Sequence, residues 1–514
     1  MPDNTSSNKR IAKNTLLLYL RMFYSMIISL VTARVILNAL GFEDYGLYNV
    51  IGSIVSMFVF LRSAMGNSVH RYITFSIGKG NYDDVRKVFS LSIVIFSGLA
   101  LLIVFLCETV GLWFFYEKLN IPEGRENAAF WVYQFSVITT ALTVICVPYD
   151  AIIIAHERMK VFAFVQVLNA TLNLGIVYLV AVSPFDKLIV YALLLMLIQV
   201  LNRIIYGIYC GKNFPETKFT FIKDWALMKE MTSFAGWSLL GNMIWVGCTQ
   251  GLNIMLNLFF GTAVNAARGI AVNVQGTING FVTNFQMAAN PQIIKSYAAG
   301  DFKRLHSLLF FSSKFSFFLL LLMELPVIIE ADMILKLWLG TVPEYTVAFL
   351  RISLLTILIE ALENPIGVAN NATGQIKKFN LTSSSLKALI IVFSYIALRF
   401  GYPAVSVFVI QFVVISIVLF VKVNMVKGRI KLSLRQYIYH LVFPILISAL
   451  VSSVIPISLY CFTEQGVLRL ILVLLTSVLS VLITAFFFGL NRSEKQIVIK
   501  QVQTTWNKWR KKEA

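Results

Sequence analysis

Residues 404–421 read A-V-S-V-F-V-I-Q-F-V-V-I-S-I-V-L-F-V, a stretch of 18 positions without a charged side chain. A helix needs roughly 20 apolar residues to cross about 30 Å of hydrocarbon, so this stretch predicts a membrane-spanning helix. Similar segments recur along the whole chain. The predicted spans are 14–40, 45–66, 89–113, 129–154, 161–182, 187–210, 234–260, 263–289, 308–330, 347–369, 379–398, 404–421, 437–460 and 468–490.

The composition supports a membrane protein, because 58% of the 514 residues are hydrophobic and only 13% are charged. Soluble domains are about a quarter charged. We therefore expect an all-α polytopic membrane protein with 14 transmembrane helices. The first apolar run is too long for a signal peptide. The cysteines and histidines are scattered, so no disulfide, metal site or other cofactor is expected.

Basic residues are distributed unevenly among the predicted loops. The amino terminus, the loops after even-numbered spans and the tail carry about 30 of the 44 Lys and Arg residues, whereas the loops after odd-numbered spans carry about six. Positive charge stays on the cytoplasmic side of a membrane. This predicts a multi-pass membrane protein with both termini in the cytoplasm. The net charge of +19 then reflects topology and requires no nucleic-acid partner.

Four landmarks recur later in the chain at an almost constant spacing. The pairs, separated by 220 or 217 residues, are Gly41 with Gly261, Gly80 with Gly300, Pro148 with Pro365 and Phe162 with Phe379. The repeat unit is six helices, so both copies enter the membrane in the same sense. Transporters built from such repeats bind substrate at the midplane between the halves and alternate access by rocking.

The repeat predicts two six-helix pseudo-symmetric lobes plus two extra C-terminal helices. The predicted parts are an N-lobe at 1–211, a cytoplasmic linker at 212–233, a C-lobe at 234–428, two further spans within 429–490 and a basic amphipathic tail at 491–514. One chain already contains both lobes, so we expect a monomer. The tail interleaves Trp506 and Trp509 with basic residues, which fits an interfacial helix or a solvated basic tail.

Polar residues follow one face of the first, second, seventh and eighth predicted spans, by the rule that spacings of 3, 4, 7 and 11 share a helix face. Such a face is costly in lipid. It either bonds neighbouring helices or lines a water-filled cavity, and whole faces on four helices favour the cavity. The candidates for lining this cavity are Asn242, Gln250, Asn253, Asn257, Gln275, Asn279, Gln286 and Asn290.

The charged residues on these faces are arginines. Arg21 and Arg268 lie on the polar faces of the first and eighth spans, and guanidinium binds phosphate in a bidentate manner. Arg62 lies off the polar face of the second span. Snorkelling or an interhelical ion pair accounts for Arg62 at least as well as substrate contact.

Acidic residues lie in other predicted spans. Asp150, Glu360 and Glu363 are candidates for coupling transport to protons or sodium. Glu360, nearest to mid-span, would alternatively neutralise a basic residue such as Lys387. Asp150 follows Pro148 near the predicted cytoplasmic face, where it would cap a helix or gate the path.

Three stretches resemble a known family. They are L-G-F-E-D-Y-G-L-Y-N-V at 40–50, G-N-Y-D-D-V-R-K at 80–87 and N-F-Q-M-A-A-N-P-Q-I-I-K-S-Y-A-A-G-D at 284–301. With the six-helix repeat, they make residues 10–490 similar to polysaccharide-biosynthesis flippases of the Wzx type. These flippases belong to the multidrug/oligosaccharidyl-lipid/polysaccharide (MOP) exporter superfamily. The 14 spans, rather than 12, resemble the peptidoglycan-precursor flippase branch.

The resemblance implies a protein of the bacterial inner membrane. It would export a polyprenyl-pyrophosphate-linked oligosaccharide, such as an O-antigen, capsule or exopolysaccharide repeat unit, from the inner to the outer leaflet. By analogy, Arg21 and Arg268 would hold the pyrophosphate, and Arg62 joins them because related flippases use an arginine in that helix. The glycan would lie along the Asn and Gln side chains. Other polysaccharide-assembly proteins are possible partners.

Three other classes of protein compete with this interpretation. A cation-coupled multidrug exporter of the same fold would need an acid in the cavity, where the first span offers Arg21 instead. A membrane enzyme would need larger outer loops with paired carboxylates, and no nucleotide-binding, zinc-protease or serine-hydrolase motif occurs. A channel would not require duplicated lobes. The sequence therefore predicts a transporter rather than an enzyme.

Overall fold

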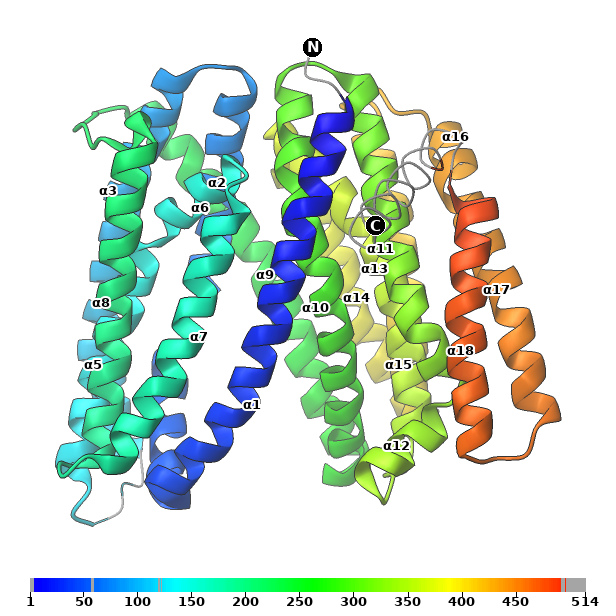
Figure 1. The fold of residues 1–514 in the computed structure, drawn as a ribbon, viewed down its shortest axis with the longest axis horizontal. Helices are drawn as coiled ribbons and strands as arrows, with labels where there is room; N and C mark the ends of the chain where they lie inside the picture. Colours follow the sequence, from blue (N-terminus) through cyan, green and yellow to red (C-terminus); the bar gives the residue numbers. More distant parts are fainter. Residues whose placement is uncertain (1–3, 57–59, 119–120, 122, 491–494, 496–514) are drawn as a thin grey trace, which may run out of the picture. The chain divides into compact units, whose positions relative to one another are not determined.

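The computed structural model describes residues 4–56, 60–118, 121, 123–490 and 495, and they form helices joined by short loops (Figure 1). The α-helices are α1 (Asn4–Ser56), α2 (Phe60–Gly78), α3 (Tyr82–Leu106), α4 (Leu112–Lys118), α5 (Glu126–Ile145), α6 (Val147–Ala155), α7 (Met159–Val182), α8 (Lys187–Asn213), α9 (Trp225–Phe260), α10 (Thr262–Ala298), α11 (Phe302–Ile329), α12 (Ala331–Leu339), α13 (Thr346–Thr373), α14 (Lys377–Arg399), α15 (Val405–Val426), α16 (Leu434–Tyr437), α17 (Phe443–Phe462) and α18 (Val467–Thr484).

Ten helical segments within the described residues are long and apolar enough to cross a membrane. They begin at α3, α5, α7, α8, α9, α11, α14, α15, α16 and α18. The protein is therefore an all-α, multi-pass membrane protein. The helices α1, α2, α10 and α13 are not among the ten, and they contain the predicted first, second, eighth and tenth spans.

Local sequence explains where several helices begin. Asn81 caps α3 by accepting a hydrogen bond from the backbone N–H of Asp84 at 3.1 Å. Asp186 caps α8 in the same way, and Ser433 forms a capping box with Gln436 ahead of α16. Such side chains satisfy N–H groups that the first turn leaves unpaired. About half of the predicted linker 212–233 is α-helical, because α8 continues to Asn213 and α9 starts at Trp225.

Left-handed backbone positions recur at the spacing of the sequence landmarks. Gly41 (φ 78°), which interrupts α1, matches Gly261 (φ 80°) between α9 and α10. Other left-handed pairs, separated by 220, 217 and 216 residues, are Gly80 with Gly300, Glu157 with Gly374, and Gly124 with Gly340. Glycine adopts this conformation without the steric cost that a Cβ brings. Glu157, with φ 59°, is the member that carries a side chain.

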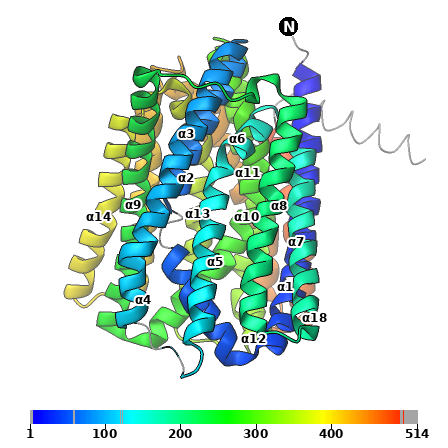
Figure 2. The ribbon, with the colours of Figure 1, turned by 90° about the vertical axis from the view of Figure 1, so that its left-hand side faces the viewer.

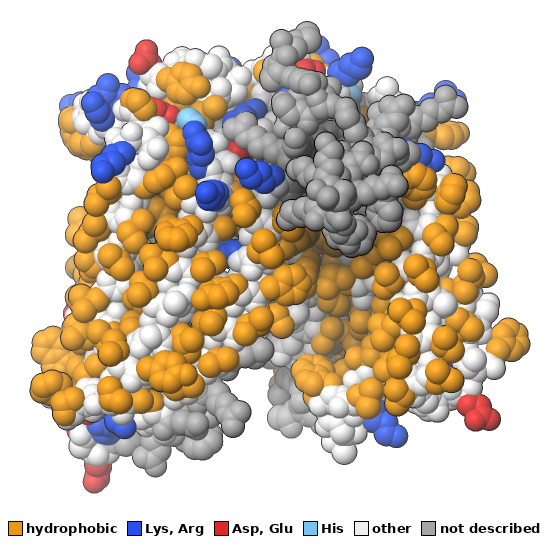
Figure 3. Space-filling view, viewed as in Figure 1, with side chains coloured by type: hydrophobic (Ala, Val, Ile, Leu, Met, Phe, Trp, Pro, Cys, Tyr) orange, Lys and Arg blue, Asp and Glu red, His pale blue; other side chains and the backbone are white. Residues whose placement is uncertain are grey.

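The chain divides into two compact units. Unit 1 comprises residues 1–242, 287–301 and 374–380. Within it α5 packs between α3 and α8, while α1 packs along α7 (Figure 2). Its core is apolar and includes Phe89, Phe96 and Tyr133. In Figure 3, apolar side chains cover the middle of unit 1, and Lys and Arg gather at one end.

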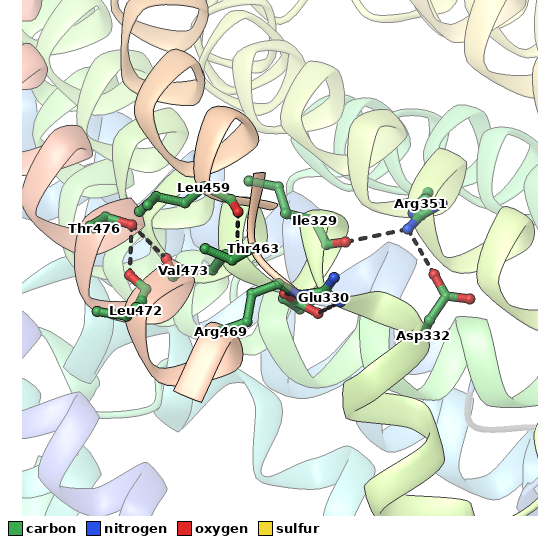
Figure 4. Close-up of polar contacts among 10 residues, drawn as sticks. All are labelled: Ile329, Glu330, Asp332, Arg351, Leu459, Thr463, Arg469, Leu472, Val473 and Thr476. Atoms are coloured by element: carbon green, nitrogen blue, oxygen red, sulfur yellow. Dashed lines mark hydrogen bonds and ion pairs between the residues drawn. The ribbon is translucent and has the colours of Figure 1, made fainter. Parts of the chain in front are cut away.

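Unit 2 comprises residues 243–286, 302–373 and 381–514. Within it α13 packs between α11 and α15, and the paired helices α17 and α18 pack against α11. A buried ion pair joins α18 to this bundle: the Arg469 guanidinium donates to both carboxylate oxygens of Glu330, at 2.6 and 3.0 Å (Figure 4). Nearby, Arg351 donates to the Ile328 carbonyl oxygen at 2.9 Å and to Asp332 at 3.0 Å.

Candidate functional site

A cavity with a volume of about 1030 Å³ lies in unit 2. It is lined by the consecutive helices α9 and α10 together with α13 and α15, which come much later in the chain. Six of the predicted site residues line it: Gln250, Asn253, Arg268, Gln275, Asn279 and Glu360. The periodicity of the seventh and eighth predicted spans therefore identified side chains that share one cavity.

Arg268 is held in place by the neighbouring helix α9. Its Nη2 donates to the backbone carbonyl of Thr249 at 2.9 Å, and its Nη1 donates to Oδ1 of Asn253. Asn253 in turn donates to Oε1 of Gln250 at 3.3 Å. A guanidinium carries five N–H donors, so these two bonds leave donors for a ligand. The arrangement presents a fixed positive charge, surrounded by amide groups, to the cavity.

Glu360 is the acidic residue among the described lining residues of this cavity. Its side chain is half-buried on α13, and within the described residues it makes no hydrogen bond or ion pair. The cavity thus contains one arginine and one carboxylate. A carboxylate with open lone pairs can accept a proton or contact a cation.

Glu363, one turn after Glu360 on α13, has a different environment. Its Oε1 accepts from the ammonium groups of Lys387, at 3.0 Å, and of Lys422. Lys387 also lies over the ring of Trp245 at 4.8 Å, and Trp245 lines the cavity. Glu363 is therefore neutralised by two lysines, and it lies behind the cavity wall rather than in it.

Other predicted residues lie away from the cavity. Gln286 is buried, and its Nε2 donates to Oγ of Ser316 at 3.1 Å and to the Ala361 carbonyl at 3.3 Å. Its amide thus bonds helix to helix, which was the alternative considered for the polar faces. Asn242 and Asn290 belong to unit 1.

Two of the remaining candidates, Arg21 and Asp150, lie in unit 1, and the side chains of the other two are not described. Arg21 on α1 is half-buried, with its guanidinium carbon 5.9 Å from the centre of the Phe162 ring. Asp150 is half-buried on α6, which begins at the break that Pro148 makes after α5. The side chains of Arg62 and Asn257 lie outside the described residues.

Several lining residues were not predicted. Trp245 and Phe408 place aromatic rings beside the amides, and Asn273, Ser353 and Gln411 add polar groups. The sequence does not show whether an aromatic residue in an apolar span faces a cavity or the lipid. Gln411 could have been predicted, because it is the single amide in the otherwise apolar stretch 404–421.

Comparison with known families gives one match that covers more than half of the chain. The model of the family described as polysaccharide biosynthesis protein matches residues 11–296. A search of curated proteins finds no match.

Solved structures share the fold at low sequence identity. The outward-facing conformation of a multidrug resistance MATE family transporter of the MOP superfamily superposes with a TM-score of 0.69 at 14% identity, covering 83% of this chain and 96% of that one. A MOP superfamily transporter from Pyrococcus furiosus Vc1, for which reverse polarity of the binding pocket suggests a different function, gives 0.67 at 14% identity, with the same coverage. A MATE protein in the straight conformation gives 0.68 at 14% identity, covering 83% and 96%. The likeness shows the fold alone.

Proposed function

The chain belongs to the polysaccharide biosynthesis protein family, with the fold of MOP superfamily transporters, and from this we propose that it flips a lipid-linked oligosaccharide. The substrate would be a polyprenyl-pyrophosphate carrying an O-antigen, capsule or exopolysaccharide repeat unit. The protein would move it from the inner to the outer leaflet by alternating access, as a transporter without enzymatic activity. Assembly proteins of the same pathway would be its partners, and it would act as a monomer.

The single observation that carries this proposal is the chemistry of the unit 2 cavity. Arg268 offers a fixed guanidinium, which suits a phosphate group. Gln250, Asn253 and Asn279 offer donors and acceptors for sugar hydroxyls, and Trp245 offers an aromatic face. A diphosphate-linked glycan needs both kinds of group, whereas a purely apolar substrate would need neither.

The proposed architecture has 14 spans, which adds four to the ten apolar segments. In this proposal the additional spans lie in the helices α1, α2, α10 and α13. In this topology the lobes would be 1–211 and 234–428, with both termini in the cytoplasm of a bacterium.

Unit 1 would contribute to the path through Arg21 and Arg62. In this proposal Arg21 and Arg62 bind the pyrophosphate, as Arg268 does. Asn242, Asn257 and Asn290 would extend the glycan path. The lipid tail would stay in the bilayer, because burying a long hydrocarbon chain in a polar cavity is unfavourable.

Among the acids, Glu360 is the strongest candidate for ion coupling because it lines the cavity without a hydrogen-bonding partner in the described part of the chain. Glu363 would serve instead as a fixed anchor for Lys387 and Lys422. Asp150 would act near the cytoplasmic end of unit 1, as a helix cap or gate.

A second candidate function, export of cationic drugs, is favoured by one observation. Glu360 places a carboxylate in the cavity of a protein that has the fold of MATE transporters. A cationic drug would approach Glu360, whereas an anionic lipid diphosphate would approach Arg268. Substrate charge therefore separates the two functions.

The test is a flipping assay in proteoliposomes with a fluorescent polyprenyl-pyrophosphate oligosaccharide in one arm and a fluorescent organic cation in the other. We expect protein-dependent movement of the diphosphate lipid and none of the cation. Empty liposomes control for spontaneous flipping. Transport of the cation alone would replace the flippase proposal with the drug-exporter function.

A further inference from the structure

The connection between α8 and α9 contains an extended segment in which exposed and half-buried residues alternate. Phe219, Phe221, Lys223 and Trp225 are exposed, whereas the residues between them are half-buried. Successive side chains of an extended chain point to opposite sides, so one side carries the two phenylalanines and the lysine, and the tryptophan follows at the start of α9. The three aromatic residues are 54%, 80% and 64% exposed. A row of exposed aromatic rings marks an interaction surface.

The backbone of this segment is fixed to α3. The N–H of Thr220 donates to Oγ of Ser90 at 3.2 Å, and the carbonyl of Lys218 accepts from Nε of Arg86, also at 3.2 Å. Ser90 and Arg86 are one helical turn apart, and all four residues belong to unit 1. Because both contacts use backbone groups of the segment, its aromatic side chains are held facing outward.

The contacts with α3 show where the segment lies relative to the membrane. Helix α3 has four charged residues within 83–87, and no other follows until Glu108. At 1.5 Å per residue, the uncharged stretch 88–107 is long enough to cross about 30 Å of hydrocarbon. Arg86 and Ser90 therefore mark one edge of the hydrocarbon, and the segment bonded to them lies at the membrane interface.

The charges of the segment complement an anionic surface. Lys218 and Lys223 are exposed, and within the described residues neither forms an ion pair. The nearby acids have partners of their own: Oε1 of Glu216 lies 2.6 Å from Nε2 of His156, and Oδ1 of Asp224 accepts from a backbone N–H in the first turn of α9 at 3.0 Å. The two lysines are thus available to bind anionic groups.

We propose that residues 218–225 form an interfacial anchor that binds anionic phospholipids of the bilayer. Phe219, Phe221 and Trp225 insert among the headgroups, as aromatic residues do at membrane interfaces. Lys218 and Lys223 bind the lipid phosphates. The positive-inside pattern assigns this connection to the cytoplasm, and the cytoplasmic leaflet is the one that carries negative surface charge. A protein partner would not explain why the aromatic row lies at the hydrocarbon edge of α3.

The test places a fluorescent reporter beside the interfacial anchor in the full-length protein. The reporter is a dansyl group on Ala226→Cys, an exposed position next to Trp225. The background is Cys461→Ser, because the other four cysteines are buried. The protein is reconstituted in phosphatidylcholine vesicles that contain a small amount of nitroxide-labelled phosphatidylglycerol or, separately, of nitroxide-labelled phosphatidylcholine. Quenching of the dansyl fluorescence is compared between the two lipids.

We expect the phosphatidylglycerol probe to quench more strongly, since each interfacial lysine favours an anionic lipid roughly fivefold. Lys218→Gln combined with Lys223→Gln should make the two probes quench equally. Lys212→Gln, an exposed lysine at the end of α8 that precedes the bonded segment, is the matched control and should keep the preference. Phe219→Ser combined with Phe221→Ser should weaken quenching by both probes, because the reporter is no longer held at the interface.

Equal quenching by the two probes in the wild type would overturn the recognition of anionic lipid. Quenching by neither probe would overturn the interfacial anchor as a whole and assign the aromatic row to a protein partner. Undiminished quenching in the double phenylalanine variant would show that these rings do not hold the segment in the membrane. None of these measurements uses the transported substrate, so their outcome is independent of the proposed flippase function.

Discussion

At the residue scale, the cavity is organised by hydrogen bonds that fix a charge before a ligand arrives. Arg268 is bound to α9 through Thr249 and Asn253, so it need not be immobilised when an anion binds. Pre-organisation of this kind reduces the entropic cost of binding. Glu360 is the opposite case, since within the described residues it has no bonded partner and is available for protonation.

Replacing Glu360 with Gln should separate coupling from substrate movement. Glutamine keeps the size of the side chain and cannot bind or release a proton. In Glu360→Gln, we expect a proton or sodium gradient no longer to accelerate flipping. The rate measured without a gradient should equal that of the wild type. Glu344→Gln, in an exposed loop, is the matched control. A gradient-driven rate equal to wild type in Glu360→Gln would show that coupling does not use this residue.

His70 predicts a pH dependence of stability. Burial, with Lys295 nearby, lowers its pKa to about 4, from an ordinary value near 6.5. The folded state disfavours the charged form of His70. The contribution of neutral His70 to the free energy of unfolding is therefore fully present above pH 6.5 and is lost as the pH falls toward 4. The loss is roughly 3 kcal/mol.

The measurement for His70 is thermal unfolding of the purified protein in detergent at pH 7, 5 and 4. The His70→Gln variant has no imidazole to protonate, so its stability should fall less over this range. If the variant and the wild type lose stability in parallel, other groups cause the acid sensitivity.

At the element scale, the pair α17 and α18 is joined to unit 2 by Arg469 and Glu330 (Figure 4). Both side chains are buried, so removing one leaves an uncompensated charge. Arg469→Ala should destabilise the protein by about 3–5 kcal/mol, and Arg469→Met combined with Glu330→Leu should recover most of that loss. Thermal unfolding checks both. A loss below about 1 kcal/mol in Arg469→Ala would mean that apolar packing alone holds α18.

Helix periodicity predicted much of the candidate site and missed specific parts of it. Gln250, Asn253, Arg268, Gln275 and Asn279 share a face by spacing, and they line one cavity. The periodicity did not distinguish Gln286, on the same face, because only the neighbouring helices decide whether an amide finds partners. The pairing of Glu363 with Lys387 and Lys422 depends on how three consecutive helices, α13, α14 and α15, pack together, so spacing within one helix contains no information about it.

The same reasoning applies to the helices. Apolar length located the ten described spans directly, whereas the breaks within them depended on single residues. Gly41 interrupts α1, and Pro148 separates α6 from α5. The predicted spans leave residues 114–128 and 331–346 as loops, and α12 at Ala331–Leu339 occupies part of the second loop. Short amphipathic helices of this kind lack the length that identifies a span.

At the scale of the whole molecule, the chain belongs to the polysaccharide biosynthesis protein family and has the fold of MOP superfamily transporters. The central claim beyond this is that the cavity recognises a lipid-linked diphosphate through Arg268. This claim links one side chain to the substrate class. It therefore requires a measurement in which side-chain charge and substrate charge are varied together.

The most direct test is the initial flipping rate of a polyprenyl-pyrophosphate oligosaccharide in proteoliposomes containing wild type, Arg268→Lys, Arg268→Ala or Arg399→Ala. Arg399 is an exposed arginine at the end of α14, so its variant controls for loss of charge elsewhere. We predict a loss of roughly tenfold to a hundredfold for Arg268→Ala, the scale of a lost charged hydrogen bond, and a smaller loss for Arg268→Lys. The Arg399→Ala rate should equal wild type. Undiminished flipping of the diphosphate lipid by a folded Arg268→Ala protein would contradict the account.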